Sequence, residues 1–228
     1  SLNQRQLVTR YHRVKQVRPF TGEAGAVADV FVLSRVTLGA DIAITSVMLD
    51  AAKRRFPQAS IRLAGGEKSW KLFAADGRIA WLPATYGRDG TLRERLSVAS
   101  SLTERFSEPG SIVIDPDSRI TQLGLVPISP EENYYFFDSR SYGGDGDDSL
   151  TALARRWVEE VFGVRDAAPY IAPAPEPSPS DERFITVNLG VGENPAKRVP
   201  DPFEEQVLDY LTRKGLPVVV DLGAGGEE

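Results

Sequence analysis

The sequence predicts an α/β protein in which helices cover both faces of mostly parallel sheets. Two observations indicate this class. Short β-rich apolar runs alternate with segments whose apolar residues recur at helical spacing. A proline-rich stretch then separates a long first series of these units from a short second one. Hydrophobic residues make up 41% of the 228 residues, which is enough to build a buried core.

The series opens with a βαβ unit. Residues 28–34 (ADVFVLS) are a short apolar, β-rich run, and residues 35–40 form the loop that follows. Residues 41–56 carry apolar side chains at helical spacing, and Pro57 ends this helix. Residues 60–64 form the next strand, so we expect a right-handed crossover between two parallel strands.

The same two patterns continue along the chain. A helix of residues 150–162 is expected to begin at Asp148 or Ser149, which are favoured capping residues. The aromatic run 134–137 is expected to pack in the core. Further strands are predicted at 79–82, 111–114 and 134–137, and further helices at 66–74, 92–106 and 150–162.

Composition changes after the last of these helices. Residues 166–179 contain five prolines and read as a semi-rigid linker. A strand (184–189), a loop (190–200), a helix (201–213) and a strand (217–222) follow. One such unit has too little surface to be stable alone, so it either docks on the first sheet or opens a second domain that is truncated in this sequence, and we expect the second. The predicted divisions are an arm (1–27), a first domain (28–165), a linker (166–182) and the start of a second domain (183–228).

Composition and charge exclude several classes of site and partner. The chain has no cysteine and only one histidine, His12, which excludes disulfides, cysteine-ligated metals and a multi-histidine metal site. The first 22 residues hold five basic side chains and no acid, whereas the rest holds 22 basic and 32 acidic ones. A body this acidic argues against a nucleic-acid partner. The basic arm is either a solvated terminus or a contact for anionic lipid. No membrane-spanning stretch or signal-peptide core is evident, so we expect a cytoplasmic protein, with peripheral contact to the inner membrane as an option.

Asp41 is the first candidate for chemistry. It follows a strand directly and stands at the predicted start of a helix, which places it at the carboxyl edge of a parallel sheet. Ligands of open α/β sheets bind at this edge, and a carboxylate there can act as a general base. The alternative interpretation is structural, because aspartate is also a favoured N-cap residue.

Two loops offer charge for anions. The loop that follows strand 184–189 contains Gly190, Gly192 and Lys197, so its backbone can approach a phosphate closely while the lysine supplies a positive charge. It matches neither a Walker A loop nor a dinucleotide fingerprint, and an ordinary turn is the alternative. Arg35 and Arg119 lie in loops at the same sheet edge as Asp41 and are either ligands for an anionic acceptor or ordinary surface arginines.

Three segments together resemble the bacterial lipopolysaccharide heptosyltransferases of glycosyltransferase family 9. They are residues 33–57, which contain Asp41, residues 188–200, and the glycine- and glutamate-rich residues 222–228. The resemblance implies a GT-B architecture of two Rossmann-like domains. It further implies inverting transfer of heptose from an ADP-sugar to a lipopolysaccharide acceptor, without a cofactor or a required metal.

The resemblance also implies roles for single residues. Asp41 takes the position of the catalytic base, and Lys197 that of the cation at the donor diphosphate, with Gly190, Gly192 and Glu227 also on the donor side. Arg35, Thr37 and Arg119 fall on the acceptor side. The family has glycine directly before the acid, where this chain has Ala40, which reads as an insertion or a substitution. A non-catalytic member that binds a sugar or a partner protein is the alternative function.

Overall fold

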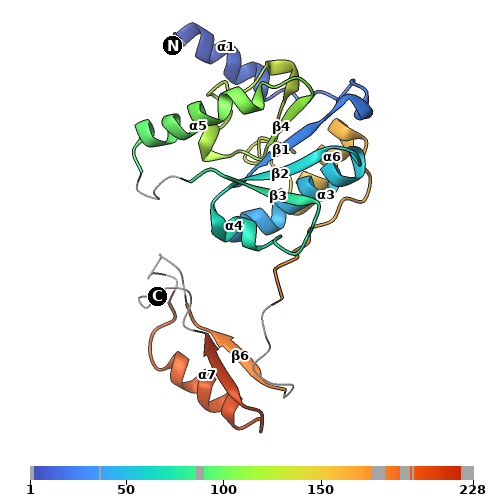
Figure 1. Ribbon diagram of the computed structural model, residues 1–228. Coiled ribbons are helices and arrows are strands. Elements are labelled where there is room, and N and C mark those ends of the chain that lie inside the picture. Colours follow the sequence, from blue (N-terminus) through green and yellow to red (C-terminus); the bar gives the residue numbers. More distant parts are fainter. Residues whose placement is uncertain are drawn as a thin grey trace. The chain divides into compact units, whose positions relative to one another are not determined.

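The structure is a computed structural model that describes residues 3–35, 37–85, 90–175, 183–190, 196 and 198–221. The chain divides into two compact units, Ser1–Pro175 (unit 1) and Glu176–Glu228 (unit 2) (Figure 1).

A five-stranded parallel sheet forms the centre of unit 1. Its strand order is β3-β2-β1-β4-β5, and every neighbouring pair is parallel. This order is that of a doubly wound Rossmann-like sheet, so the predicted α/β class is confirmed. The strands are β1 (Asp29–Leu33), β2 (Ser60–Gly65), β3 (Ile79–Pro83), β4 (Ser111–Asp115) and β5 (Tyr134–Phe136).

Helices cover both faces of this sheet (Figure 1). The α-helices of unit 1 are α1 (Gln4–Val14), α2 (Leu38–Ala40), α3 (Ser46–Arg55), α4 (Glu67–Lys71), α5 (Leu92–Phe106) and α6 (Leu150–Phe162). Between α2 and α3, residues Asp41–Thr45 form a π-helical segment, η2. The other short helical turns are η1 (Ala24–Ala26), η3 (Arg119–Thr121) and η4 (Glu131–Asn133). Ser149 caps α6 as predicted, since its side chain accepts a hydrogen bond from the backbone N–H of Ala152 at 3.2 Å.

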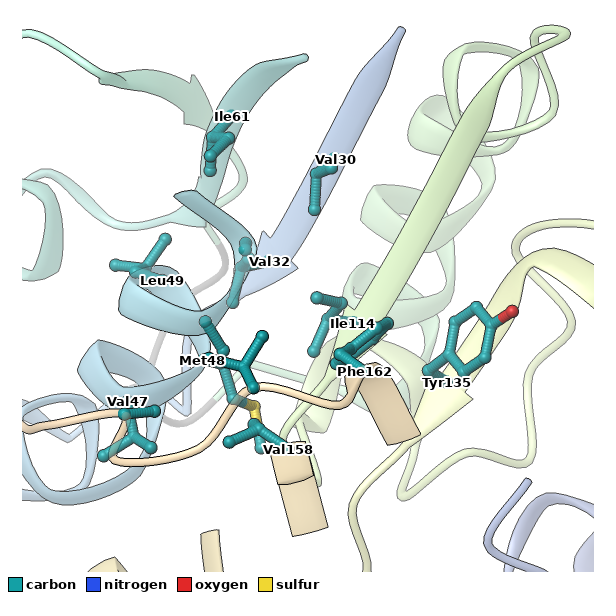
Figure 2. Close-up of a cluster of buried hydrophobic side chains, with 14 of the residues drawn as sticks. Val30, Val32, Val47, Met48, Leu49, Ile61, Ile114, Tyr135, Val158 and Phe162 are labelled. Carbon is teal, nitrogen blue, oxygen red and sulfur yellow. The ribbon is translucent and has the colours of Figure 1, made fainter. Parts of the chain in front are cut away.

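Strand alternation divides the core between the two faces. Val30 and Val32 of β1 point to one face, where α3 and α6 pack, and Phe31 and Leu33 point to the other, where α5 packs. Figure 2 shows the first of these clusters, with strand side chains meeting Met48 of α3 and residues of α6. Burial of each such side chain contributes about 1.5–3 kcal/mol, so both helix layers are held firmly on the sheet.

The basic N-terminal segment is folded into unit 1 rather than extended in solvent. Residues 4–14 form α1, whose Arg10 is only 4% exposed. Its Nε donates to the carbonyl of Gly124 at 2.9 Å, and its Nη1 pairs with Glu131 at 3.2 Å. Lys15 pairs with Asp138 at 2.6 Å. These partners lie more than 100 residues later in the chain, so local sequence does not reveal them. The pairing leaves less of the segment's charge for an anionic lipid, and no described helix is long and apolar enough to cross a membrane.

The first part of the proline-rich stretch also packs on unit 1. The backbone of Ala172 donates to Leu72 at 2.7 Å and accepts from Ala75 at 2.8 Å. The ring of Tyr170 packs edge-on against Phe73, with ring centroids 5.4 Å apart. Residues 166–175 therefore belong to the folded body of unit 1.

Unit 2 contains one βαβ crossover, as predicted from its sequence. Strands β6 (Ile185–Asn188) and β7 (Val218–Asp221) pair in parallel, and α7 (Phe203–Thr212) lies between them in the chain. Among the described residues of unit 2, only Val187 is buried.

Candidate functional site at the carboxyl edge of the sheet

The carboxyl ends of the parallel strands in unit 1 bring several polar side chains together. Ser34 follows β1, Gly65 ends β2, and Asp115 ends β4. Open α/β sheets bind their ligands at this edge, because the strand ends and helix starts there leave backbone groups and loops free to meet a ligand.

Asp41 lies at this edge and is fully buried, with 0% exposure. Its Oδ2 accepts a hydrogen bond from Ser34 Oγ at 2.7 Å. Its Oδ1 accepts from the backbone N–H of Arg35 at 2.8 Å and from Thr45 Oγ1 at 2.7 Å. The three donors compensate the cost of burying the carboxylate, and the carboxylate in turn fixes the loop that follows β1.

Asp41 is not the N-cap residue of its helix, so the N-cap interpretation is wrong. The helix begins earlier, at Leu38, with Thr37 as the N-cap residue, and the backbone N–H of Asp41 already donates to Thr37 at 2.9 Å. The carboxylate reaches back to the N–H of Arg35 instead of a helix N–H. Loop residues 38–40 were predicted as irregular because glycine and alanine at 39 and 40 carry no helical periodicity.

The helix that follows β1 contains a π-helical turn at Asp41. In η2 the backbone N–H of Ser46 donates to the carbonyl of Asp41, five residues back. A π-turn holds one residue more than an α-turn, so a helix can absorb an extra residue there without changing the facing of later residues. Segments of this kind are frequent at functional sites.

A cavity of about 270 Å³ opens beside Ser34, which donates to Asp41. An ideal Cβ at Gly65 would lie 2.4 Å from the Cβ of Ser34, so only glycine permits this close approach of β1 and β2. Asp41 does not line the cavity, but its hydrogen-bond partner Ser34 does. The cavity is lined by Ser34, Gly65, Gly66, Glu67, Lys68, Ser69, Ala84, Thr85 and Ile120.

A cluster of arginines lies at the same edge. Asp117 is 3% exposed, and its Oδ2 lies 3.5 Å from Arg35 Nη2 and 3.3 Å from Arg140 Nε. Ser139 Oγ donates to the same oxygen at 2.8 Å. Two guanidinium groups thus share one carboxylate, which leaves a net positive charge at the surface. Arg140 was not predicted as a site residue, because only the fold brings residue 140 next to residues 35 and 117.

The other predicted acceptor-side residues are exposed. Arg119 lies in η3, two residues after Asp117, and Thr37 precedes α2. The loop that carries Arg119 is fixed by Asp115, whose carboxylate accepts from the N–H of Ser118 at 2.6 Å and from the Tyr134 hydroxyl at 2.5 Å. Burial raises the pKa of Asp115 to about 6, although these hydrogen bonds act in the opposite direction.

The predicted donor-side residues fall in unit 2. Gly190 is exposed at the end of β6, and its N–H donates to Asn188 Oδ1 at 2.8 Å. Gly192, Lys197 and Glu227 lie outside the described residues. A cavity of about 290 Å³ in this unit is lined by Asn188, Leu189, Gly190, Arg198, Val199, Phe203 and Glu204. Within the described part of the chain, no cluster of three or more His, Cys, Asp or Glu side chains is arranged to hold a metal ion.

No protein-family model matches the sequence, and no curated protein matches it. The fold is similar to that of a family 9 glycosyl transferase from Veillonella parvula (TM-score 0.58, 20% identity, 85% of this chain and 62% of that chain). It is also similar to the Escherichia coli heptosyltransferase WaaC with ADP-2-deoxy-2-fluoro heptose (TM-score 0.59, 12% identity, 88% and 70%). A third similar structure is the E. coli ADP-heptose LPS heptosyltransferase II (TM-score 0.50, 18% identity, 84% and 63%). These matches confirm the GT-B type of α/β fold. The chain spans about 62% of the length of the Veillonella protein.

Proposed function

We propose that the protein is an inverting glycosyltransferase that moves a sugar from a nucleotide-sugar donor to a hydroxyl of a cell-envelope glycan. The fold similarity to two heptosyltransferases supports this reaction class. The WaaC structure is one with an ADP-linked heptose analogue, so we propose an ADP-sugar, with heptose as the sugar, as the donor. The acceptor in this proposal is a lipopolysaccharide core or a related glycan.

The observation that carries the proposal is the buried carboxylate of Asp41 beside the 270 Å³ cavity at the sheet edge. In the reaction, an acceptor hydroxyl loses its proton to this carboxylate, which acts as the general base. The acceptor oxygen attacks the anomeric carbon from the face opposite the nucleotide. The nucleoside diphosphate leaves with the electron pair, so the configuration inverts.

The arginine cluster indicates the charge of the acceptor. Arg35 and Arg140 share the single carboxylate of Asp117, and exposed Arg119 adds a third guanidinium at this edge. Guanidinium groups bind carboxylates and phosphates through two parallel hydrogen bonds. We therefore propose that the acceptor is anionic and that these arginines, with Thr37, bind it.

In this proposal, residues of unit 2 bind the nucleotide-sugar donor. Gly190 and Gly192 allow the backbone to approach the diphosphate, and Lys197 offsets the charge that builds on the leaving group. Glu227 contacts the donor sugar or nucleotide. In this proposal the lysine and backbone N–H groups, rather than a metal ion, stabilise the leaving diphosphate.

Replacing Asp41 with asparagine tests the proposed base in the complete encoded protein. The asparagine Oδ1 keeps the hydrogen bonds from Arg35 and Thr45, and its amide N–H can donate to Ser34 Oγ, so the fold is expected to persist. Because the asparagine amide cannot accept the proton of the acceptor hydroxyl, we expect turnover to fall at least about 100-fold, with donor affinity unchanged. Released nucleoside diphosphate reports turnover, and titration calorimetry reports binding. Asp50→Asn, on the same helix, is the matched control, and Asp41→Asn with wild-type turnover would remove Asp41 as the base.

A non-catalytic binding module is the second candidate. The complete hydrogen bonding of buried Asp41 favours it, because that is also how a purely structural carboxylate is held. A protein of this kind binds sugar or a partner protein but releases no nucleoside diphosphate, and Asp41→Asn leaves its binding unchanged. The wild-type transfer assay separates the two candidates.

A further inference from the structure

Direct contact between the acceptor and Asp41 conflicts with the burial of this side chain. Asp41 has 0% exposure and does not line the neighbouring cavity. Oδ1 already accepts from the Arg35 N–H and from Thr45 Oγ1, both on the side of the helix and loop. Oδ2 accepts from Ser34 Oγ at 2.7 Å. Of these three described donors, Ser34 is the one that lines the cavity, so a proton from a ligand in the cavity reaches Asp41 through Ser34.

Ser34 is suited to this position. It lines the 270 Å³ cavity, and its Oγ lies 2.7 Å from Asp41 Oδ2 and 3.2 Å from Ser69 Oγ, which lines the same cavity. A hydroxyl has one proton and two lone pairs, so Ser34 can donate to Asp41 while it accepts from the cavity side. The cavity wall thus presents a hydroxyl that is connected to a buried base.

We propose that Ser34 is a catalytic residue that relays the proton of the acceptor hydroxyl to Asp41. This inference rests on the proposed glycosyltransferase function and adds the position of the acceptor, whose reacting hydroxyl enters the 270 Å³ cavity and takes the place of Ser69 on Ser34 Oγ. In the transfer step the acceptor O–H bond breaks and its proton moves to Ser34 Oγ. At the same time the Ser34 O–H proton moves to Asp41 Oδ2. The acceptor oxygen bonds to the anomeric carbon of the nucleotide sugar, and the bond to the diphosphate oxygen breaks with its electron pair.

A positioning role for Ser34 is the competing explanation, and Thr45 provides the matched control for it. Thr45 is 0% and Ser34 1% exposed, and the Thr45 hydroxyl donates to the same carboxylate at the same distance of 2.7 Å. It does not line the cavity. Ser34→Ala and Thr45→Val each remove one hydroxyl from the carboxylate, but only Ser34→Ala interrupts the path to the cavity.

The experiment compares kcat and KM of the complete wild-type protein, Ser34→Ala, Thr45→Val and Asp41→Asn, with an ADP-sugar donor and a glycan acceptor. A relay predicts that Ser34→Ala lowers kcat by about 10²–10⁴-fold, close to the loss in Asp41→Asn, while Thr45→Val stays within about tenfold of wild type. Rates of the wild-type protein in mixtures of H₂O and D₂O should depend non-linearly on the deuterium fraction, because two protons move together. This second measurement needs no variant and stands if Ser34→Ala does not fold.

The outcomes separate the relay from the proposed function. Equal losses in Ser34→Ala and Thr45→Val, or a linear isotope dependence, overturn the relay and leave Asp41 as a base that the acceptor reaches directly. A wild-type protein without transfer, or with transfer that Asp41→Asn does not change, overturns the proposed base and the relay with it.

Discussion

Two buried carboxylates organise the sheet edge at the level of single residues. Asp41 is compensated by three donors and fixes the loop after β1, and Asp115 does the same for the loop after β4. The position of Asp41 at this edge was predictable from a strand followed by a helix. Its burial was not, because it depends on Ser34 turning inward beside Gly65. One signal of a buried carboxylate was available in the sequence. Thr45 lies four residues after Asp41 and therefore on the same helical face.

Asp115 predicts a pH dependence of stability. Its pKa is about 6 in the folded protein, above its ordinary value near 4, because burial disfavours the charged form. Between about pH 4 and 6, Asp115 is therefore protonated in the folded state and ionised in the unfolded chain. The contribution of Asp115 to the unfolding free energy therefore falls as pH rises, by about 3 kcal/mol in total and by about 2 kcal/mol between pH 4 and 6.

Urea unfolding of wild type and Asp115→Asn at pH 4, 5.5 and 7 measures this contribution. The asparagine does not ionise, so the stability of wild type relative to Asp115→Asn should fall by about 2 kcal/mol from pH 4 to pH 7. Asp166→Asn, at a carboxylate whose side chain is 89% exposed, should leave the wild-type profile unchanged. A pH-independent difference between wild type and Asp115→Asn would contradict the raised pKa.

At the level of elements, periodic patterns predicted every strand of the sheet and the helices that cover it. The exceptions have physical causes. Helix α1 was missed although Leu7, Tyr11 and Val14 recur at helical spacing, because the basic side chains and the absence of acid were interpreted as an arm. The π-segment η2 was missed because an extra residue in a turn leaves no mark on hydrophobic spacing. The π-segment and the anchoring of α1 through Arg10 depend on contacts made by the folded chain.

The anchoring of α1 gives a prediction at this level. Arg10 donates to the carbonyls of Gly124 and Val126 and pairs with Glu131, whereas Arg5 on the same helix is exposed. Arg10→Ala leaves these acceptors without a donor, so it should lower the unfolding free energy by about 3 kcal/mol. Arg5→Ala should change it by less than about 0.5 kcal/mol. Chemical denaturation measures both, and equal effects would show that α1 is not held through Arg10.

At the level of the whole molecule, the two units differ in how much core they hold. Unit 1 has apolar clusters on both faces of its sheet, whereas the described residues of unit 2 bury only Val187. The prolines indicated a division of the chain. They did not indicate that residues 166–175 pack on unit 1, because those contacts join residues about 100 positions apart, such as Ala172 and Leu72.

This difference predicts that residues 1–175 fold alone. All the contacts that hold both sheet faces lie within this range, so the fragment should unfold cooperatively, with an unfolding free energy within about 1 kcal/mol of that transition in the longer chain. The matched control ends at residue 165 and lacks the Ala172 backbone hydrogen bonds and the Tyr170 ring. Loss of these contacts should cost about 2–4 kcal/mol, since each buried hydrogen bond contributes about 1 kcal/mol and the aromatic ring adds a similar amount. Circular dichroism during urea unfolding checks both fragments. If the 165-residue fragment were as stable as the 175-residue one, residues 166–175 would be a linker that only lies against unit 1, and the folded body would end with α6.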